Sequence, residues 1–271
     1  MLIAQISDTH VKDASIRLFG TVDAYGAMAR AVDRIGAMDP APDVVIHSGD
    51  IANDGEVADY AAAAALLARL PMPVHVTLGN HDLRAAARTA LGHLPGLPAG
   101  GRFAYAVEDH AVRIVALDSL VEGAAHGELG QAQLRWLDET LAARAGAPTL
   151  VMLHHPPFAT GVRHMDRIGL ADAGALAEVI ARHRQVGRVL AGHVHGAFTT
   201  AFAGTIAMTA PGTAHQVVVD LAPEAGAAWA ADPPGLLLHR FRDGDFTTVA
   251  VPVEPAPPHP FSDGHTVVAS A

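Results

Sequence analysis

Residues 43–54 have the sequence DVVIHSGDIAND. The β-branched residues 44–46 predict a buried strand of a parallel sheet, and Gly49-Asp50 ends it. Ligands of open α/β sheets bind at the carboxyl ends of the strands, which is where the carboxylate of Asp50 is expected to stand. A Gly-Asp pair alone often marks only a turn, as we expect at residues 243–245. A functional role for Asp50 therefore depends on the rest of the chain.

The same pattern, a short apolar strand followed by polar residues, occurs four more times before residue 196. The additional strands are predicted at residues 2–6, 74–78, 149–153 and 188–191, and they are followed by Asp8-Thr9-His10, Gly79-Asn80-His81-Asp82, His154-His155 and Gly192-His193-Val194-His195. Residues 103–107 and 112–117 are predicted to form an antiparallel pair. Helical patterns alternate with these strands at residues 23–38, 56–70, 84–91, 129–143 and 173–184, which indicates an α/β fold.

From residue 197 onward the pattern changes to successive strands with turns between them. We expect antiparallel strands at residues 198–209, 216–221, 235–241 and 246–253. No repeat or linker precedes them, so residues 1–253 are interpreted as one domain. Its β-rich C-terminal part, residues 197–253, is a candidate cap or dimerisation element, and residues 254–271 form a proline-rich tail.

Composition excludes several classes of partner and site. The 271 residues include 28 Asp and Glu against 18 Lys and Arg, a formal net charge of −10. Binding the phosphates of a polynucleotide requires a basic surface, so no nucleic-acid polymer is expected as a partner. The chain has no cysteine and 17 histidines, which excludes thiolate metal sites and leaves His, Asp, Glu and Asn as possible ligands.

The sequence contains no run of about 18 apolar residues, the length that a membrane span requires. Its first residues lack a charged leader and predict a strand at once. We therefore expect no membrane partner and a cytoplasmic location.

The polar residues at the strand ends have the composition of a site for two metal ions. Nitrogen and oxygen donors suit two divalent ions about 3.5–4 Å apart, which stabilise the attacking and leaving oxygens of an in-line displacement. Asp50 is the expected bridge, because a carboxylate has two oxygens and its charge offsets the repulsion between the ions. The donors suit Mn, Fe, Co or Zn without distinguishing among them. The predicted ligands besides Asp50 are Asp8, His10 and His195 for one ion, and Asn80, His154 and His193 for the other.

With these five blocks in order, each after a predicted strand, the chain resembles the calcineurin-like metallophosphoesterase family over residues 8–195. The resemblance implies a four-layer α/β/β/α sandwich in which two mixed sheets pack face to face. Within the family the chain is most similar to bacterial glycerophosphodiesterases and class III cyclic-nucleotide phosphodiesterases. Residues 154–157 and 211–217 are similar to the glycerophosphodiesterase branch.

The resemblance and the chemistry of two metal ions together imply a phosphodiesterase of small diesters, either glycerophosphodiesters or 3′,5′-cyclic nucleotides. A hydroxide bridging the ions would attack phosphorus in line, because the two ions lower the pKa of bound water towards neutrality. His81 is the expected proton donor to the leaving group, since its family counterpart lies beside the substrate phosphate. Asp82 and His155 are expected to support the ligands.

Three residues are candidates for contact with the substrate. The similar branch has the counterpart of His215 near its site. Phe19 and Phe158 are apolar residues in predicted loops near the mouth of the site, where they would either cover the substrate or pack in a dimer contact.

Two other functions remain open. A phosphomonoester carries more negative charge than a diester, and Arg163 and Arg167 are available to contact it. A non-catalytic scaffold would be expected to have lost ligands, whereas the seven ligands and His81 are all present. A homo-oligomer, a dimer or larger, is expected because strands at the edge of the β-rich part invite pairing with another subunit.

Overall fold

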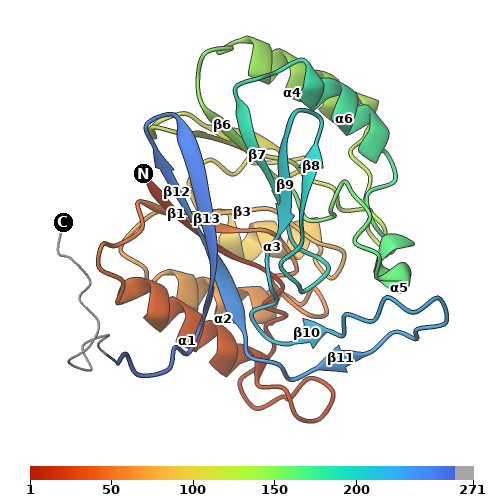
Figure 1. The fold of residues 1–271 in the computed structure, drawn as a ribbon. Helices are drawn as coiled ribbons and strands as arrows, with labels where there is room; N and C mark the ends of the chain where they lie inside the picture. Colours follow the sequence, from red (N-terminus) through yellow and green to blue (C-terminus); the bar gives the residue numbers. More distant parts are fainter. Residues whose placement is uncertain (260–271) are drawn as a thin grey trace, which may run out of the picture.

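The first of two large sheets contains the strand of residues 44–46. In the computed structural model, which describes residues 1–259, this sheet has the strand order β13-β12-β1-β2-β3 (Figure 1). The strands β1, β2 and β3 are parallel, whereas β12 is antiparallel to both of its neighbours, so the sheet is mixed. Its members are β1 (Leu2–Ile6), β2 (Val44–His47), β3 (Val74–Val76), β12 (Gly235–Arg242) and β13 (Asp245–Pro252).

The second large sheet is also mixed and has the order β4-β5-β6-β7-β9-β8. Strands β5, β6, β7 and β9 are parallel, and the edge strands β4 and β8 are antiparallel to their neighbours. The pairing predicted between residues 103–107 and 112–117 is confirmed as β4 with β5. The strands are β4 (Tyr105–Val107), β5 (Arg113–Ala116), β6 (Thr149–Met152), β7 (Val186–Ala191), β8 (Thr199–Phe202) and β9 (Thr205–Thr209).

Alternation along the strands explains why the sheets pack face to face. Ile3, Val44 and Ile46 belong to a buried cluster that includes residues of β5, β6 and β7, so this face of the first sheet meets the second sheet. Ala4 and Val45 point the other way, into a cluster shared with helices. Both faces of β2 are therefore buried, which accounts for the uninterrupted apolar run at residues 44–46.

Helices cover the outer face of each sheet and complete the predicted four layers (Figure 1). Buried residues of α1, α2 and α3 pack on the first sheet, and those of α4 and α6 pack on the second. The short α5 lies near the carboxyl ends of the strands. The helices are α1 (Ala24–Gly36), α2 (Val57–Leu67), α3 (Arg84–Leu91), α4 (Gly130–Ala142), α5 (Arg163–Asp166) and α6 (Ala173–Ala181).

The prediction of one strand over residues 198–209 was wrong. These residues form the hairpin β8–β9, which turns at Ala203 and Gly204, where φ is 49° and 86°. The glycine adopts this left-handed conformation without steric cost, so the chain reverses within the predicted strand. Because β9 then pairs in parallel with β7, the C-terminal strands are not a purely antiparallel run.

The β-rich C-terminal part is distributed over the molecule. One pair of strands, β8–β9, extends the second sheet and another, β12–β13, extends the first. The strand predicted at residues 216–221 is reduced to β10 (Gln216–Val217), which pairs with β11 (Trp229–Ala230) in a small sheet of its own. Most of the predicted tail lies outside the described residues. Within residues 1–259, no helix has both the length and the apolarity needed to cross a membrane.

A buried hydrogen-bond network crosses the space between the sheets. The amide nitrogen of Gln5 donates to Ser48 Oγ at 2.9 Å and to the carbonyl oxygen of Ala191, on the second sheet, at 3.0 Å. Its amide oxygen is therefore the acceptor for Nε2–H of His239, at 3.0 Å. His239 Nδ1 lies 2.9 Å from the hydroxyl of Thr248, and a neutral imidazole accepts a hydrogen bond from that hydroxyl.

The pKa of His239 generates a prediction about acid stability. Burial lowers this pKa from 6.5 to about 3, and Arg188 adds to the effect. Between pH 6.5 and 3 the unfolded state binds a proton that the folded state does not, so His239 costs stability as the pH falls. From pH 7.5 to 5 the wild-type protein should lose about 2 kcal/mol more free energy of unfolding than His239→Gln. Denaturant titrations at both pH values measure the difference, and equal losses would contradict the prediction.

Candidate metal centre

The carboxyl ends of β1, β2, β3, β6 and β7 meet at one place between the two sheets. Parallel strands end on the same side of a sheet, so the loops that follow them gather there. The structure brings together all seven residues that the sequence predicted as ligands, and six of them are buried. These residues are Asp8, His10, Asp50, Asn80, His154, His193 and His195.

The first group of donor atoms comes from the loops after β1 and β7. Nε2 of His10 lies 3.2 Å from Nε2 of His195, and the latter lies 3.4 Å from Oδ1 of Asp8. Nε2 of His10 is also 3.6 Å from Oδ2 of Asp50. This group therefore reaches the carboxylate of Asp50 on one side.

The second group reaches the same carboxylate from the other side. Nε2 of His154 lies 3.4 Å from Oδ2 of Asp50 and 3.2 Å from Oδ1 of Asn80. The same amide oxygen is 2.9 Å from Nδ1 of His193. Oδ2 of Asp50 is thus shared by two groups of nitrogen and oxygen donors, as a bridging position requires.

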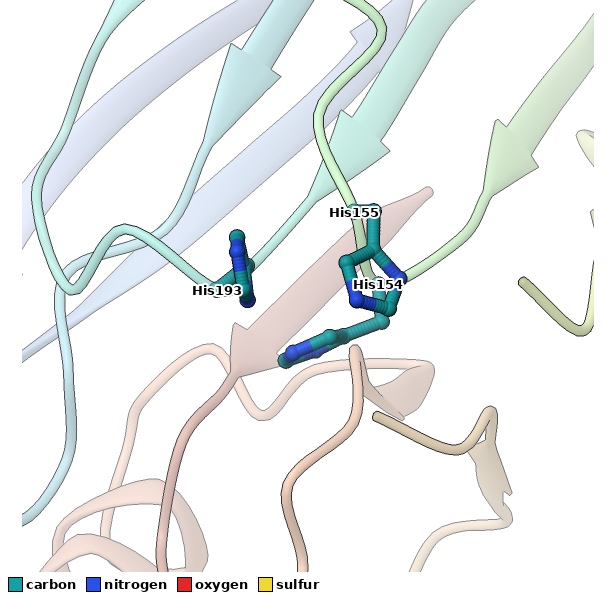
Figure 2. A group of neighbouring side chains, drawn as sticks. All are labelled: His154, His155 and His193. Atoms are coloured by element: carbon teal, nitrogen blue, oxygen red, sulfur yellow. The ribbon is translucent and has the colours of Figure 1, made fainter. Parts of the chain in front are cut away.

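Figure 2 shows a third histidine, His155, beside His154 and His193. Its Nδ1 lies 2.8 Å from Oγ of Ser119, and its Nε2 lies 3.2 Å from the carbonyl oxygen of Ala125. Both ring nitrogens already have partners, so we interpret His155 as a support for its neighbours and not as a ligand.

The spacing of the donors tests whether a metal ion fits. Two donors bound to one ion at about 2.0–2.2 Å lie about 2.9–3.6 Å apart in octahedral or tetrahedral geometry. The contacts within each group, 2.9–3.6 Å, fall in that range. This cluster of His and Asp residues fits a metal site.

The buried carboxylate of Asp50 requires positive charge nearby. Burial opposes its ionisation, but His154, His10 and His81 together outweigh burial, and the pKa of Asp50 lies well below its ordinary value. Burial likewise lowers the pKa of His154, yet the charges of Asp50 and Asp8 raise it to about 9. The ionised carboxylate of Asp50 thus requires a compensating cation beside it, which a bound metal ion would supply.

Five of the seven predicted ligands have a left-handed backbone. Outside glycine this conformation costs about 1–3 kcal/mol per residue, and it collects where a site demands a sharp change of direction. Here it turns the chain just after each strand so that side chains from one loop reach the same cluster. The φ values are 53° for Asp8, 44° for His10, 53° for Asp50, 72° for His193 and 44° for His195.

One glycine of these loops is required by close approach. A Cβ atom at Gly79 would overlap Oδ1 of Asp50 and approach Cε1 of His154 to 2.7 Å. The strand-end loops therefore pack against one another without room for a side chain, which explains the glycine before Asn80.

Asp82 ties two of the loops together. Its buried carboxylate accepts hydrogen bonds from the backbone N–H of Ile51 at 3.2 Å and of Gly79 at 2.8 Å, and from the hydroxyl of Tyr60 at 2.9 Å. It also accepts from the backbone N–H of Ala52 at 3.1 Å. The supporting role predicted for Asp82 thus has a geometric basis. Tyr60, in the middle of α2, has no local signal that would have revealed its role.

His81 lies at the solvent side of the cluster. Its backbone N–H donates to Oδ1 of Asp50 at 2.9 Å, and its ring stands edge-on to that of His10, with centroids 4.6 Å apart. Nδ1 lies 2.8 Å from the carbonyl oxygen of Asn53 and donates to it, which leaves Nε2 free to face a substrate.

Of the three predicted substrate residues, two lie at the cluster. The ring of His215 lies 4.4 Å from that of His195, and Phe19 stands edge-on to His215 at 5.3 Å. Phe158 is half-buried and packs against the hydrophobic cluster of the second sheet, so its predicted contact with a substrate stays a prediction.

The sequence model of the calcineurin-like phosphoesterases matches residues 1–197 of this chain. The chain belongs to the calcineurin-like phosphoesterase family. The matched segment includes every strand-end loop of the metal-ligand cluster, so the family resemblance inferred from the five blocks is confirmed.

Proteins with similar sequences are named as phosphodiesterases, and a protein with a similar fold is named as a phosphatase. A probable glycerophosphodiester phosphodiesterase, GpdQ of Arcobacter nitrofigilis, is 32% identical over 240 residues, which cover 88% of each chain. The 3′,5′-cyclic adenosine monophosphate phosphodiesterase CpdA of Escherichia coli K12 is 33% identical over 217 residues, 79% of this chain and 76% of that protein. A dimetal phosphatase from Danio rerio shares the fold, with a TM-score of 0.61 at 18% identity, over 92% of this chain and 98% of that one.

The hydrogen bonds of Asp82 generate a prediction about metal affinity. Asp82→Asn places an N–H group among four donors, which should separate the loops of Asp50 and Asn80. We expect the dissociation constant for manganese or zinc to rise by about 10–100-fold, as is usual when support of metal ligands is lost. Tyr60→Phe removes one of the four bonds to Asp82, together with the acceptor of the Leu83 N–H, and should have a smaller effect. Calorimetric titration measures both, and unchanged affinity in Asp82→Asn would refute the role.

Proposed function

We propose that this phosphoesterase hydrolyses small phosphodiesters, glycerophosphodiesters or 3′,5′-cyclic nucleotides, with two divalent metal ions. The observation that carries the proposal is the sharing of Oδ2 of Asp50 by two groups of donors beside an open cavity of about 390 Å³. The names of the relatives support both kinds of diester.

The ligand assignment follows the two groups. Asp8, His10 and His195 would hold one ion and Asn80, His154 and His193 the other, with Asp50 between them. When bound, Mn, Fe, Co or Zn ions would polarise a phosphoryl oxygen and lower the pKa of bound water. The amide of Asn80 adds no charge to its group, so that group carries less negative charge than the one that contains Asp8.

The position of His81 supports a role as the proton donor, through Nε2. Its Nδ1–H is fixed on the carbonyl oxygen of Asn53, so an imidazolium would direct its other N–H into the cavity that it lines. A proton from Nε2 would neutralise the oxygen of the departing alcohol, while Asp50 anchors the backbone of His81.

The cavity favours a diester over a monoester. No lysine or arginine of the described chain is among the residues that line it. Arg163, one of the two cations considered for a monoester, donates a hydrogen bond to the carbonyl oxygen of Pro223. A phosphomonoester has one more ionisable oxygen than a diester and would lack a cationic partner beyond the metal ions. The retained ligands likewise support an enzyme over a scaffold.

Two further proposals concern the protein as a whole. Assembly into a homo-oligomer is supported by exposed apolar side chains between β10 and β11, where Val219 is 56% and Leu221 62% accessible. The net charge of −10 supports small-molecule substrates over polynucleotides. A cytoplasmic location stays a prediction.

A comparison of model esters tests the proposed reaction. After chelation and addition of manganese, the protein should hydrolyse bis(p-nitrophenyl) phosphate with a higher kcat/KM than p-nitrophenyl phosphate. Asp50→Asn, which weakens the shared carboxylate, should lose both activities. A preference for the monoester would identify a phosphatase, and inactivity with every divalent ion would favour the scaffold.

The role of His81 is tested by the leaving group. His81→Ala should retain its metal ions but lose about 10²–10⁴-fold in kcat with an alkoxide leaving group, as in a cyclic nucleotide. With p-nitrophenolate, which departs without a proton, the loss should be small. His93→Ala, an exposed histidine outside the cavity, is the matched control. Equal losses for both leaving groups would exclude proton donation.

A further inference from the structure

The cavity beside the metal-ligand cluster has two chemically different halves. Its floor consists of cluster side chains and His81, all polar. The wall above is mainly apolar and comes from three segments remote in sequence: the loop that follows β1, the region of α5, and the small sheet β10–β11. This wall includes Phe19, Met165, Ile168, Val217 and Trp229.

Two aromatic residues of this wall stack on each other. The rings of Phe19 and Trp229 have centroids 4.7 Å apart and an angle of 20° between their planes. Phe19 is 58% accessible and Trp229 is 37% accessible, so the stacked pair forms a contiguous exposed aromatic surface at the cavity. Phe19 also has a φ of 50°, a strained conformation for a bulky residue that commonly marks a functional position.

The stacked pair is held in place from several sides. His215 stands edge-on to both rings, at 83° to Phe19 and 84° to Trp229, and it also lies beside His195 and His10 of the cluster. Trp229 pairs with Val217 across the small sheet. The loop between β10 and β11 is bound to α5 through Arg163 and Pro223. The wall is therefore ordered before a substrate arrives, which reduces the entropy cost of binding.

We propose that Phe19 and Trp229 form a platform that binds the organic group of the diester and selects a planar nucleobase over a polyol such as glycerol. This inference rests on the proposed phosphodiesterase function and narrows its substrate class. A base stacks on aromatic rings and needs few hydrogen bonds from the wall. Glycerol hydroxyl groups would need polar partners, and in the described chain His164 is the one polar side chain of the cavity outside the floor.

Binding can be read directly from tryptophan fluorescence. The chain has two tryptophans, and Trp136 on α4 does not line this cavity, so Trp136→Phe leaves Trp229 as the only tryptophan, which excitation at wavelengths that tyrosine does not absorb would report alone. Stopped-flow mixing of this manganese-loaded protein with adenosine 3′,5′-cyclic monophosphate should quench its emission before turnover. Glycerophosphoethanolamine should not do so. Equal responses to both esters, or no response to the nucleotide, would overturn the platform.

Kinetics give an independent test. In Trp229→Ala the ratio of kcat/KM for the cyclic nucleotide to that for glycerophosphoethanolamine should fall about 5- to 150-fold, the range found for loss of base stacking. Trp229→Phe, which keeps a planar ring, should restore most of the ratio, and Trp136→Ala should leave it unchanged. A ratio unaltered by Trp229→Ala would refute the proposal.

The two proposals fail in different ways. If the wild-type protein hydrolyses no diester with any divalent ion, the proposed function is wrong, whereas the fluorescence titration still decides whether the platform binds a base. If it hydrolyses diesters but prefers glycerophosphoethanolamine, the function stands and the platform is refuted.

Discussion

The structure depends on the burial of one carboxylate, that of Asp50, between two groups of histidines. An ionised carboxylate of 2% accessibility is stable only if neighbouring charges and hydrogen bonds compensate for the water that it has lost. Oδ1 accepts from the backbone of His81, while Oδ2 lies 3.4 Å from His154 and 3.6 Å from His10. Because these three partners come from three loops other than that of Asp50, four loops must converge, and the left-handed residues and Gly79 are the conformational cost.

This convergence explains why two sheets are needed. The loops after β1, β2 and β3 come from the first sheet and those after β6 and β7 come from the second. The ligands can meet only if the sheets keep a fixed relation to each other. Gln5 binds Ser48 and the carbonyl oxygen of Ala191 and so connects the two sheets. It lies near the end of β1, close to the loops that carry the ligands. The apolar packing between the sheets and this polar connection therefore both serve the geometry of the site.

The sequence predicted the alternating α/β fold and the gathering of polar residues at the ends of its strands. A short apolar strand followed by a ligand residue is a local pattern, and the parallel topology then places all such residues at one edge. The hairpin at residues 198–209 was missed because Gly204 lies in a run whose composition otherwise suits a continuous strand. Tyr60 and Trp229 depend on packing between distant segments, for which the sequence gives no local sign.

The small sheet β10–β11 differs from every other strand pair in how it is held. Its two strands of two residues pair only with each other within residues 1–259, and the large sheets do not continue into it. The loop between its strands, residues 218–228, contributes no residue to the hydrophobic clusters of the two large sheets, so its length and sequence can change more freely than those of a strand-end loop. The molecule thus combines a part that tolerates almost no variation with a part that natural selection can alter independently. New substrate preferences could therefore arise in β10–β11 without a new catalytic centre.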